Sequence, residues 1–64
     1  MQWEYITLKY KATGFMGGKV DEDDISRLLN LHGRDGWELV STMDTNMADG
    51  QTRYLLFYLK RPLA

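Results

Sequence analysis

The sequence predicts an α+β domain with the element order β-α-β-β, and three patterns carry this prediction. Apolar and polar residues alternate in residues 2–10, which is typical of a strand. Apolar residues at helical spacing follow in residues 21–33. Two further strand-like segments, residues 37–43 and 53–60, flank a polar loop at residues 44–52. A chain of 64 residues is long enough for one domain at most.

The first strand divides its residues between two faces of the expected sheet. Aromatic and β-branched residues, which favour strands, dominate it. The two faces are Ile6, Leu8 and Tyr10 on one side and Trp3, Tyr5 and Thr7 on the other. A glycine-rich segment follows, where Gly14, Gly17 and Gly18 disfavour any regular element. Phe15 and Met16 within it either fold back over the core or contact a partner.

The next segment carries the signals of a helix start and of a helix face. Asp21 is a good N-cap, and the acidic residues behind it complement the positive end of the helix dipole. Gly33 is placed as the C-cap. The apolar face consists of Ile25, Leu28, Leu29 and His32. Because this helix has only about three turns, it requires packing against the sheet to be stable.

The last two strands are expected to form a hairpin. In the second strand we place Trp37, Leu39 and Met43 on one side and Val40 on the other, and this alternation does not decide which side the helix covers. The third strand is apolar on both faces, which is typical of a central strand. The predicted fold is a three-stranded antiparallel sheet, in the order 1-3-2, with one helix packed on one face.

Composition argues against several classes of protein. The net charge is −1, with 8 basic and 9 acidic residues, which argues against a strong electrostatic site for nucleic acid. The chain has no cysteine, so oligomerisation is the remaining means of stabilising so small a domain. Apolar runs fall short of the roughly 20 residues of a membrane span, and the N-terminus lacks a signal-peptide pattern. We therefore expect a cytoplasmic protein.

One glycine-rich motif resembles a phosphate-binding loop without meeting its requirements. In such loops a Gly-Lys-Ser/Thr sequence follows an earlier glycine at fixed spacing, and the hydroxyl holds magnesium. Here the spacing from Gly14 to Gly18 is one residue short, and Val20 follows Lys19 where the hydroxyl is needed. We interpret the segment as a connector.

The carboxylates and the histidine also lack the spacing of a reactive site. Acidic residues 21–24 point in different directions around a helix and do not converge on one ion. Residues 44–50 lack the spacing and the bidentate glutamate of a calcium loop. His32 has Ser26 on a different helix face, and Ser41 can approach it only through tertiary contact. We therefore expect no catalytic residue, no metal site and no cofactor.

The strongest candidate for function is an aromatic sheet face that the single helix leaves uncovered. Exposed apolar patches of a few hundred Å² mark interaction sites, and Tyr and Trp are enriched at protein interfaces. We predict a non-enzymatic self-assembly module, a homo-oligomer and most simply a dimer, that pairs through this face. The candidate interface residues are Trp3, Tyr5, Tyr54, Leu56, Tyr58, Phe15 and Met16.

Two alternative functions use the same aromatic residues. A small aromatic or nucleotide-like ligand can stack on Trp3 or Trp37 at a subunit interface. Single-stranded nucleic acid can stack on the aromatic rings while basic side chains contact its phosphates, although the negative net charge argues against it. The sequence identifies no particular ligand, protein partner or pathway.

An ordered set of short motifs resembles one protein family over nearly the whole chain. The motifs are Trp3-Glu4-Tyr5, Gly17-Gly18-Lys19, Leu29-Asn30, Gly36-Trp37-Glu38-Leu39-Val40 and Lys60-Arg61-Pro62. This set resembles the small bacterial domain-of-unknown-function family numbered 4177. The resemblance implies a compact α+β unit found in bacteria and their phages, with no assigned activity. The architecture is also similar to that of dodecin-type flavin-binding assemblies, which is an analogy of fold alone.

Overall fold

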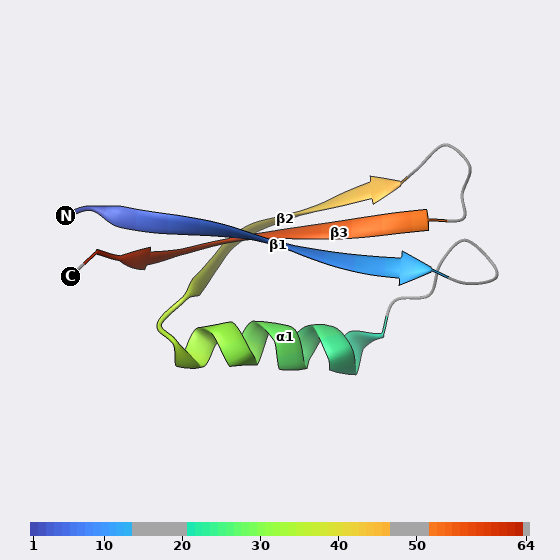
Figure 1. Cartoon of the computed structure of the whole chain (residues 1–64), viewed down its shortest axis with the longest axis horizontal. Helices are drawn as coiled ribbons and strands as arrows, with labels where there is room; N and C mark the ends of the chain where they lie inside the picture. Colours follow the sequence, from blue (N-terminus) through green and yellow to red (C-terminus); the bar gives the residue numbers. More distant parts are fainter. Residues whose placement is uncertain (14–20, 47–51, 64) are drawn as a thin grey trace.

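A three-stranded sheet with a helix along one side forms the structure (Figure 1). The computed structural model describes residues 1–13, 21–46 and 52–63. Its elements are β1 (Trp3–Thr13), α1 (Glu22–Arg34), β2 (Glu38–Asn46) and β3 (Thr52–Pro62). β3 lies between β1 and β2 and runs antiparallel to both. The predicted β-α-β-β order and the 1-3-2 sheet are confirmed.

The strands extend beyond the segments that the apolar pattern predicts. β1 and β3 pair without interruption from Trp3 opposite Pro62 to Thr13 opposite Thr52. Pairing therefore continues past the predicted ends, residue 10 in β1 and residue 60 in β3, because backbone hydrogen bonds do not require apolar side chains. Pro62 is the last residue of β3, where a missing N–H costs the sheet little.

A β-bulge interrupts the regular alternation of β2. The register with β3 shifts between Leu39 and Ser41, which leaves Val40 as the extra residue. Leu39 stands opposite the buried Leu59, whereas Met43 stands on the opposite face of the sheet. The prediction that Leu39 and Met43 share a side is therefore wrong. A strict period of two cannot reveal an inserted residue.

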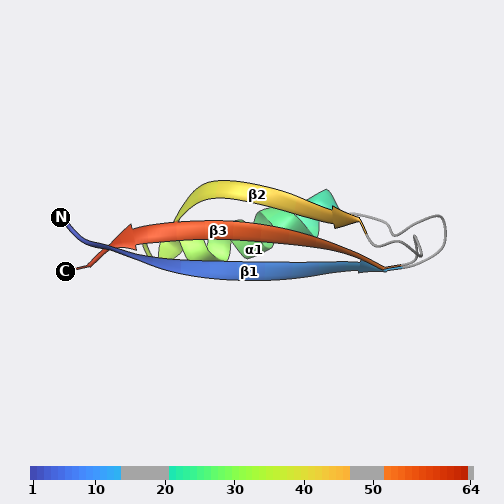
Figure 2. The same ribbon diagram turned by 90° about the horizontal axis from the view of Figure 1, so that it is seen from above.

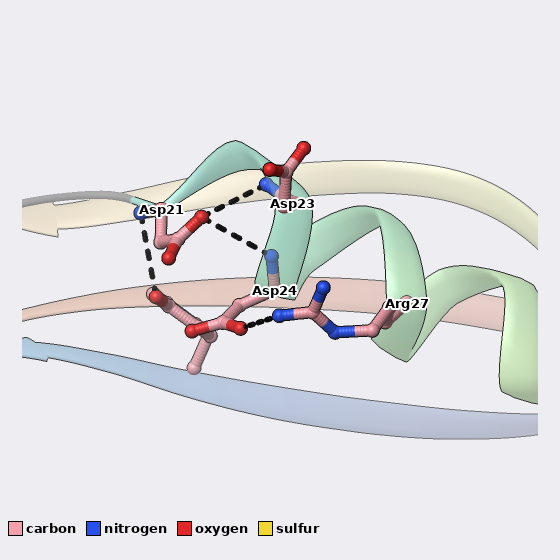
Figure 3. A network of polar contacts seen from close by, with 5 residues as sticks. Asp21, Asp23, Asp24 and Arg27 are labelled. Atoms are coloured by element: carbon pink, nitrogen blue, oxygen red, sulfur yellow. Dashed lines mark hydrogen bonds and ion pairs between the residues drawn. The ribbon is translucent and has the colours of Figure 1, made fainter.

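The N-terminus of α1 is capped as the sequence predicts (Figure 3). The Asp21 carboxylate accepts hydrogen bonds from the backbone N–H groups of Asp23, at 3.0 Å, and Asp24, at 3.4 Å. The Asp24 side chain in turn pairs with Arg27 one turn later. The Asp21 N–H donates to the Tyr10 hydroxyl at 3.4 Å, which links the helix start to β1. These acidic side chains are thus used for capping and ion pairing.

The C-terminus of α1 differs from the prediction by two residues. Gly33 lies within the helix, and Asp35 is the C-cap. The following Gly36 adopts a left-handed φ of 90° and donates to the Gly33 carbonyl at 3.0 Å. Trp37 then donates to the His32 carbonyl at 3.1 Å. This pair of bonds is a Schellman motif, which requires the glycine after the cap and not the glycine before it.

The two glycines provide a matched test of this assignment. Gly36→Ala is expected to lower the free energy of unfolding by about 1–2 kcal/mol, because alanine is strained at positive φ. Gly33→Ala is expected to raise it by up to about 1 kcal/mol, since the position is helical and has no atom within 4 Å of an added Cβ. Thermal denaturation measures both changes. Equal melting temperatures for the two variants would contradict the Schellman assignment.

The core lies between α1 and the central strand. Among the described residues, Phe57 and Leu59 are the fully buried ones, with 5% and 1% of their surfaces exposed. The helix residues of the predicted apolar face, Ile25, Leu28, Leu29 and His32, are half-buried. The predicted helix face is therefore the one turned toward the sheet, although it packs against the sheet only partly.

Candidate functional site

On one side of the sheet, none of the helices or strands of the described residues is packed, and we call this side the open face. Figure 1 shows α1 along the opposite side, and Figure 2 views the sheet with α1 behind it. Because paired residues of antiparallel strands project to the same side, the strand register determines the members of the open face. They are Trp3, Tyr5, Thr7, Lys9 and Lys11 of β1, Tyr54, Leu56, Tyr58, Lys60 and Pro62 of β3, and Glu38, Ser41, Met43 and Thr45 of β2.

The structure brings five of the predicted interface residues together on the open face. Tyr5 is 69% exposed, and Trp3 is also exposed. Tyr54, Leu56 and Tyr58 follow one another along the same side of β3 and are half-buried. The strand alternation of β1 and the central position of β3, both predicted from the sequence, are sufficient to explain this clustering.

Among the large apolar residues, the predicted interface and the described members of the open face differ at Phe15, Met16 and Met43. Phe15 and Met16 lie outside the described residues. Met43 is an exposed apolar residue of the open face, opposite Leu56, and the sequence did not suggest it. The signal was hidden by the bulge, because an uninterrupted alternation places Met43 with Leu39 on the other side of the sheet.

Lysine side chains lie over the aromatic rings of the open face. The Lys60 Nζ is 4.2 Å from the centroid of the Trp3 ring, and the Lys9 Nζ is 4.6 Å from that of Tyr54. Such cation–π contacts are worth roughly 0.5–1 kcal/mol at exposed sites. With Lys11 as a third lysine and Glu38 as the one acid, the open face is positively charged, although the chain has a net charge of −1.

A second polar cluster lies on the helix side of the sheet around Arg61. Its Nε donates to the Glu4 carboxylate at 2.9 Å, and its Nη1 donates to the Asp35 carbonyl at 2.9 Å. The guanidinium also lies over the Trp37 ring, 4.3 Å from the centroid. Arg61 therefore connects β1, β3 and the end of α1. The sequence contains both charges but gave no sign that residues 57 positions apart would meet.

His32 and the carboxylates of Asp21 and Asp24 have partners within the helix. The His32 Nδ1 donates to the Leu28 carbonyl at 2.9 Å, within the same helix. In the described part of the chain, no group of three His, Asp or Glu side chains is arranged to hold a metal ion. Over the same residues, α1 is too short and too polar to cross a membrane. The glycine-rich segment that we interpret as a connector, residues 14–19, lies outside the described residues, as do residues 47–50 of the polar loop.

Comparison with known proteins identifies a family but no characterised relative. Residues 3–62 match the family described as Domain of unknown function (DUF4177). This match covers nearly the whole chain and confirms the resemblance that the short motifs suggested. No curated protein and no solved structure matches the chain significantly.

Proposed function

We propose that this chain, which belongs to the DUF4177 family of unknown function, is a non-enzymatic module that binds copies of itself through the open face. The observation that carries the proposal is the set of aromatic side chains on a sheet face that α1, the helix of the described residues, does not cover. In a symmetric pair the same patch serves both partners, so one exposed face is sufficient for a dimer.

The size of the exposed surface supports a second copy as the occupant of this face. The chain exposes 4939 Å², whereas a compact monomer of 7.5 kDa is expected to expose about 4,250 Å². The radius of gyration is 13.5 Å, compared with about 11 Å for a compact domain of 64 residues. Both values exceed those of a compact domain, as expected of a chain that buries further surface against a second copy.

The weakness of the monomer's core supports the same proposal. Phe57 and Leu59 are the buried side chains of the described residues, and α1 contributes none. Small domains with so little buried surface are commonly stabilised by association, since binding of the folded state lowers its free energy. Tyr and Trp suit such an interface because their rings are apolar while their polar atoms can form hydrogen bonds at the rim.

Light scattering on a sizing column, at two protein concentrations, tests self-association. We expect a mass that is at least twice the chain mass of 7.5 kDa at the higher concentration. Tyr5→Asp should weaken the association by about 10–100-fold, because it places a charge in a desolvated interface. Tyr5 is 69% exposed in the monomer, so this substitution should leave the fold intact.

The matched control is Leu31→Asp, which alters a 56% exposed leucine on the outer side of α1. This variant should keep the mass of the unmodified protein. A monomer at both concentrations, or equal masses for the Tyr5 and Leu31 variants, would show that the open face does not pair with itself. The face would then be left for the second candidate, a planar anionic ligand, which is favoured by the lysines over Trp3 and Tyr54.

A further inference from the structure

The outer edge of β1 is a second surface on which a strand can bind. The strand order β1-β3-β2 leaves β1 with a partner on one side only, and Figure 2 shows it at the margin of the sheet. β1 has 11 residues, and its register with β3 contains no bulge. The opposite edge, β2, is shorter and bulged at Val40, and bulges are a common means of preventing edge-to-edge pairing. β1 is therefore the more accessible edge.

The register shows which backbone groups of β1 point outward. The Leu63 N–H donates to the Gln2 carbonyl at 2.8 Å, so the backbone of Gln2 faces β3. Along an antiparallel strand the residues alternate between facing the partner and facing away. The even-numbered residues of β1 therefore bond to β3. The outward N–H and C=O groups belong to Trp3, Tyr5, Thr7, Lys9 and Lys11, whose side chains are on the open face.

We infer that β1 pairs antiparallel with β1 of a second copy, about a two-fold axis at Thr7. This register places Thr7 opposite its own symmetry mate, Tyr5 opposite Lys9, and Trp3 opposite Lys11. All of these residues direct backbone hydrogen-bonding groups outward, so each pair can exchange two hydrogen bonds. The two sheets become one continuous sheet of six strands. This inference concerns the edge of the sheet and does not depend on the pairing of the open faces.

The side chains of β1 favour this register over its neighbours. Each exposed aromatic residue is placed opposite a lysine, and Thr–Thr pairs are themselves favourable across strands. On the helix side, Ile6 stands opposite Leu8 of the second copy. An axis at Lys9 instead places two lysines opposite each other, which is unfavourable. An axis at Tyr5 pairs Trp3 with Thr7, so Lys9 and Lys11 extend past the start of the second copy's β1 and have no residue of that strand opposite them.

The lysines also give the edge its selectivity. Lysine at a sheet edge normally discourages pairing with an arbitrary strand. In this register Lys11 is placed opposite Trp3 of the second copy, and Lys9, which lies over Tyr54 of its own chain, is placed opposite Tyr5 of the second copy. The same charges that oppose other strands thus favour a second copy of the chain.

Blocking the outward N–H of Thr7 tests the edge separately from the open face. Thr7→Pro removes a donor that β3 does not use, so circular dichroism should show a folded monomer unit. If both surfaces pair, light scattering should give an assembly of four or more chains for the unmodified protein and a dimer for Thr7→Pro. Tyr5→Asp should also give a dimer. It disrupts pairing of the open faces, but edge pairing should persist because the new carboxylate stands opposite Lys9 of the second copy. The double variant should be a monomer, and Thr7→Ala should behave like the unmodified protein.

Disulfide cross-linking provides an independent test, which does not depend on whether the fold tolerates proline at position 7. The chain has no cysteine, so a single introduced thiol can bond only to its symmetry mate. In the Tyr5→Asp background, Thr7→Cys should oxidise to a disulfide-linked dimer at least tenfold faster than Ser41→Cys, a control on the open face of β2. Paired Cα atoms about 5.5 Å apart at Thr7 are within reach of a disulfide.

The possible outcomes separate the two surfaces. An unchanged mass for Thr7→Pro, or equal oxidation rates for the two thiol variants, would overturn edge pairing whatever the behaviour of the open face. A loss of mass in Thr7→Pro with no change in Tyr5→Asp would support the edge and contradict the proposed function.

Discussion

Leu59→Ala is expected to lower the free energy of unfolding by about 2–5 kcal/mol, because a buried leucine truncated to alanine loses its apolar contacts and leaves a cavity. Leu59 is 1% exposed and lies in the central strand, between neighbours on both sides. Domains of this length have a total stability of roughly 3–10 kcal/mol. The substitution should therefore remove a large part of the stability, and urea denaturation followed by circular dichroism measures the loss.

Leu31→Ala is the control for this experiment, since it removes the same atoms from a side chain that is 56% exposed. We expect a change within about 0.5 kcal/mol, as for most surface substitutions. Leu28→Ala should fall between the two, because Leu28 is half-buried. If Leu59→Ala and Leu31→Ala unfold at the same urea concentration, the helix does not cover the side of β3 that the structure shows.

Arg61→Ala is expected to destabilise the protein by about 2 kcal/mol, through the loss of three contacts at once. The guanidinium bonds to the Glu4 carboxylate and to the Asp35 carbonyl, and it lies over the Trp37 ring. The ion pair is partly exposed, with 36% and 38% of the two side-chain surfaces accessible, so it contributes at most about 1 kcal/mol. The carbonyl bond and the ring contact supply the remainder.

Arg27→Ala provides the comparison, because its pair with Asp24 is exposed and connects residues of the same helix. Pairs at this spacing contribute about 0.2–0.5 kcal/mol. Raising the salt concentration should weaken both ion pairs. Arg61→Ala should still destabilise the protein more than Arg27→Ala, because the ring contact and the carbonyl hydrogen bond of Arg61 are less sensitive to salt. Equal melting temperatures for the two arginine variants would show that Arg61 does not hold α1 to the sheet.

The sequence is sufficient to predict the fold because each element carries its own local signal. The alternation in β1 and the cap at Asp21 are determined by neighbouring residues, and the structure contains both. The central position of β3 follows from its apolar character on both faces. The aromatic composition of the open face then follows from combining the predicted strand order with the alternation in β1.

The features that sequence reasoning missed all depend on contacts between distant residues or on a local irregularity. The bulge at Val40 changes the face of Met43 without altering composition. The link from Arg61 to Glu4 joins the start of β1 to the end of β3, which lie side by side. The lysines over Trp3 and Tyr54 likewise depend on cross-strand register. The helix ends before Gly36 and not at Gly33, because Gly36 is the residue that adopts the left-handed backbone after the cap. Either glycine is able to adopt that conformation, so the sequence alone does not decide between them.

The central strand of this sheet is the last of the three along the chain. β1 and β2 each bond to β3, and they do not pair with each other. While the chain is being synthesised, the first two strands therefore have no backbone partner until residues 52–62 have left the ribosome. Folding of the sheet must wait for that segment, and both earlier strands remain available to chaperones or to other nascent chains until it arrives.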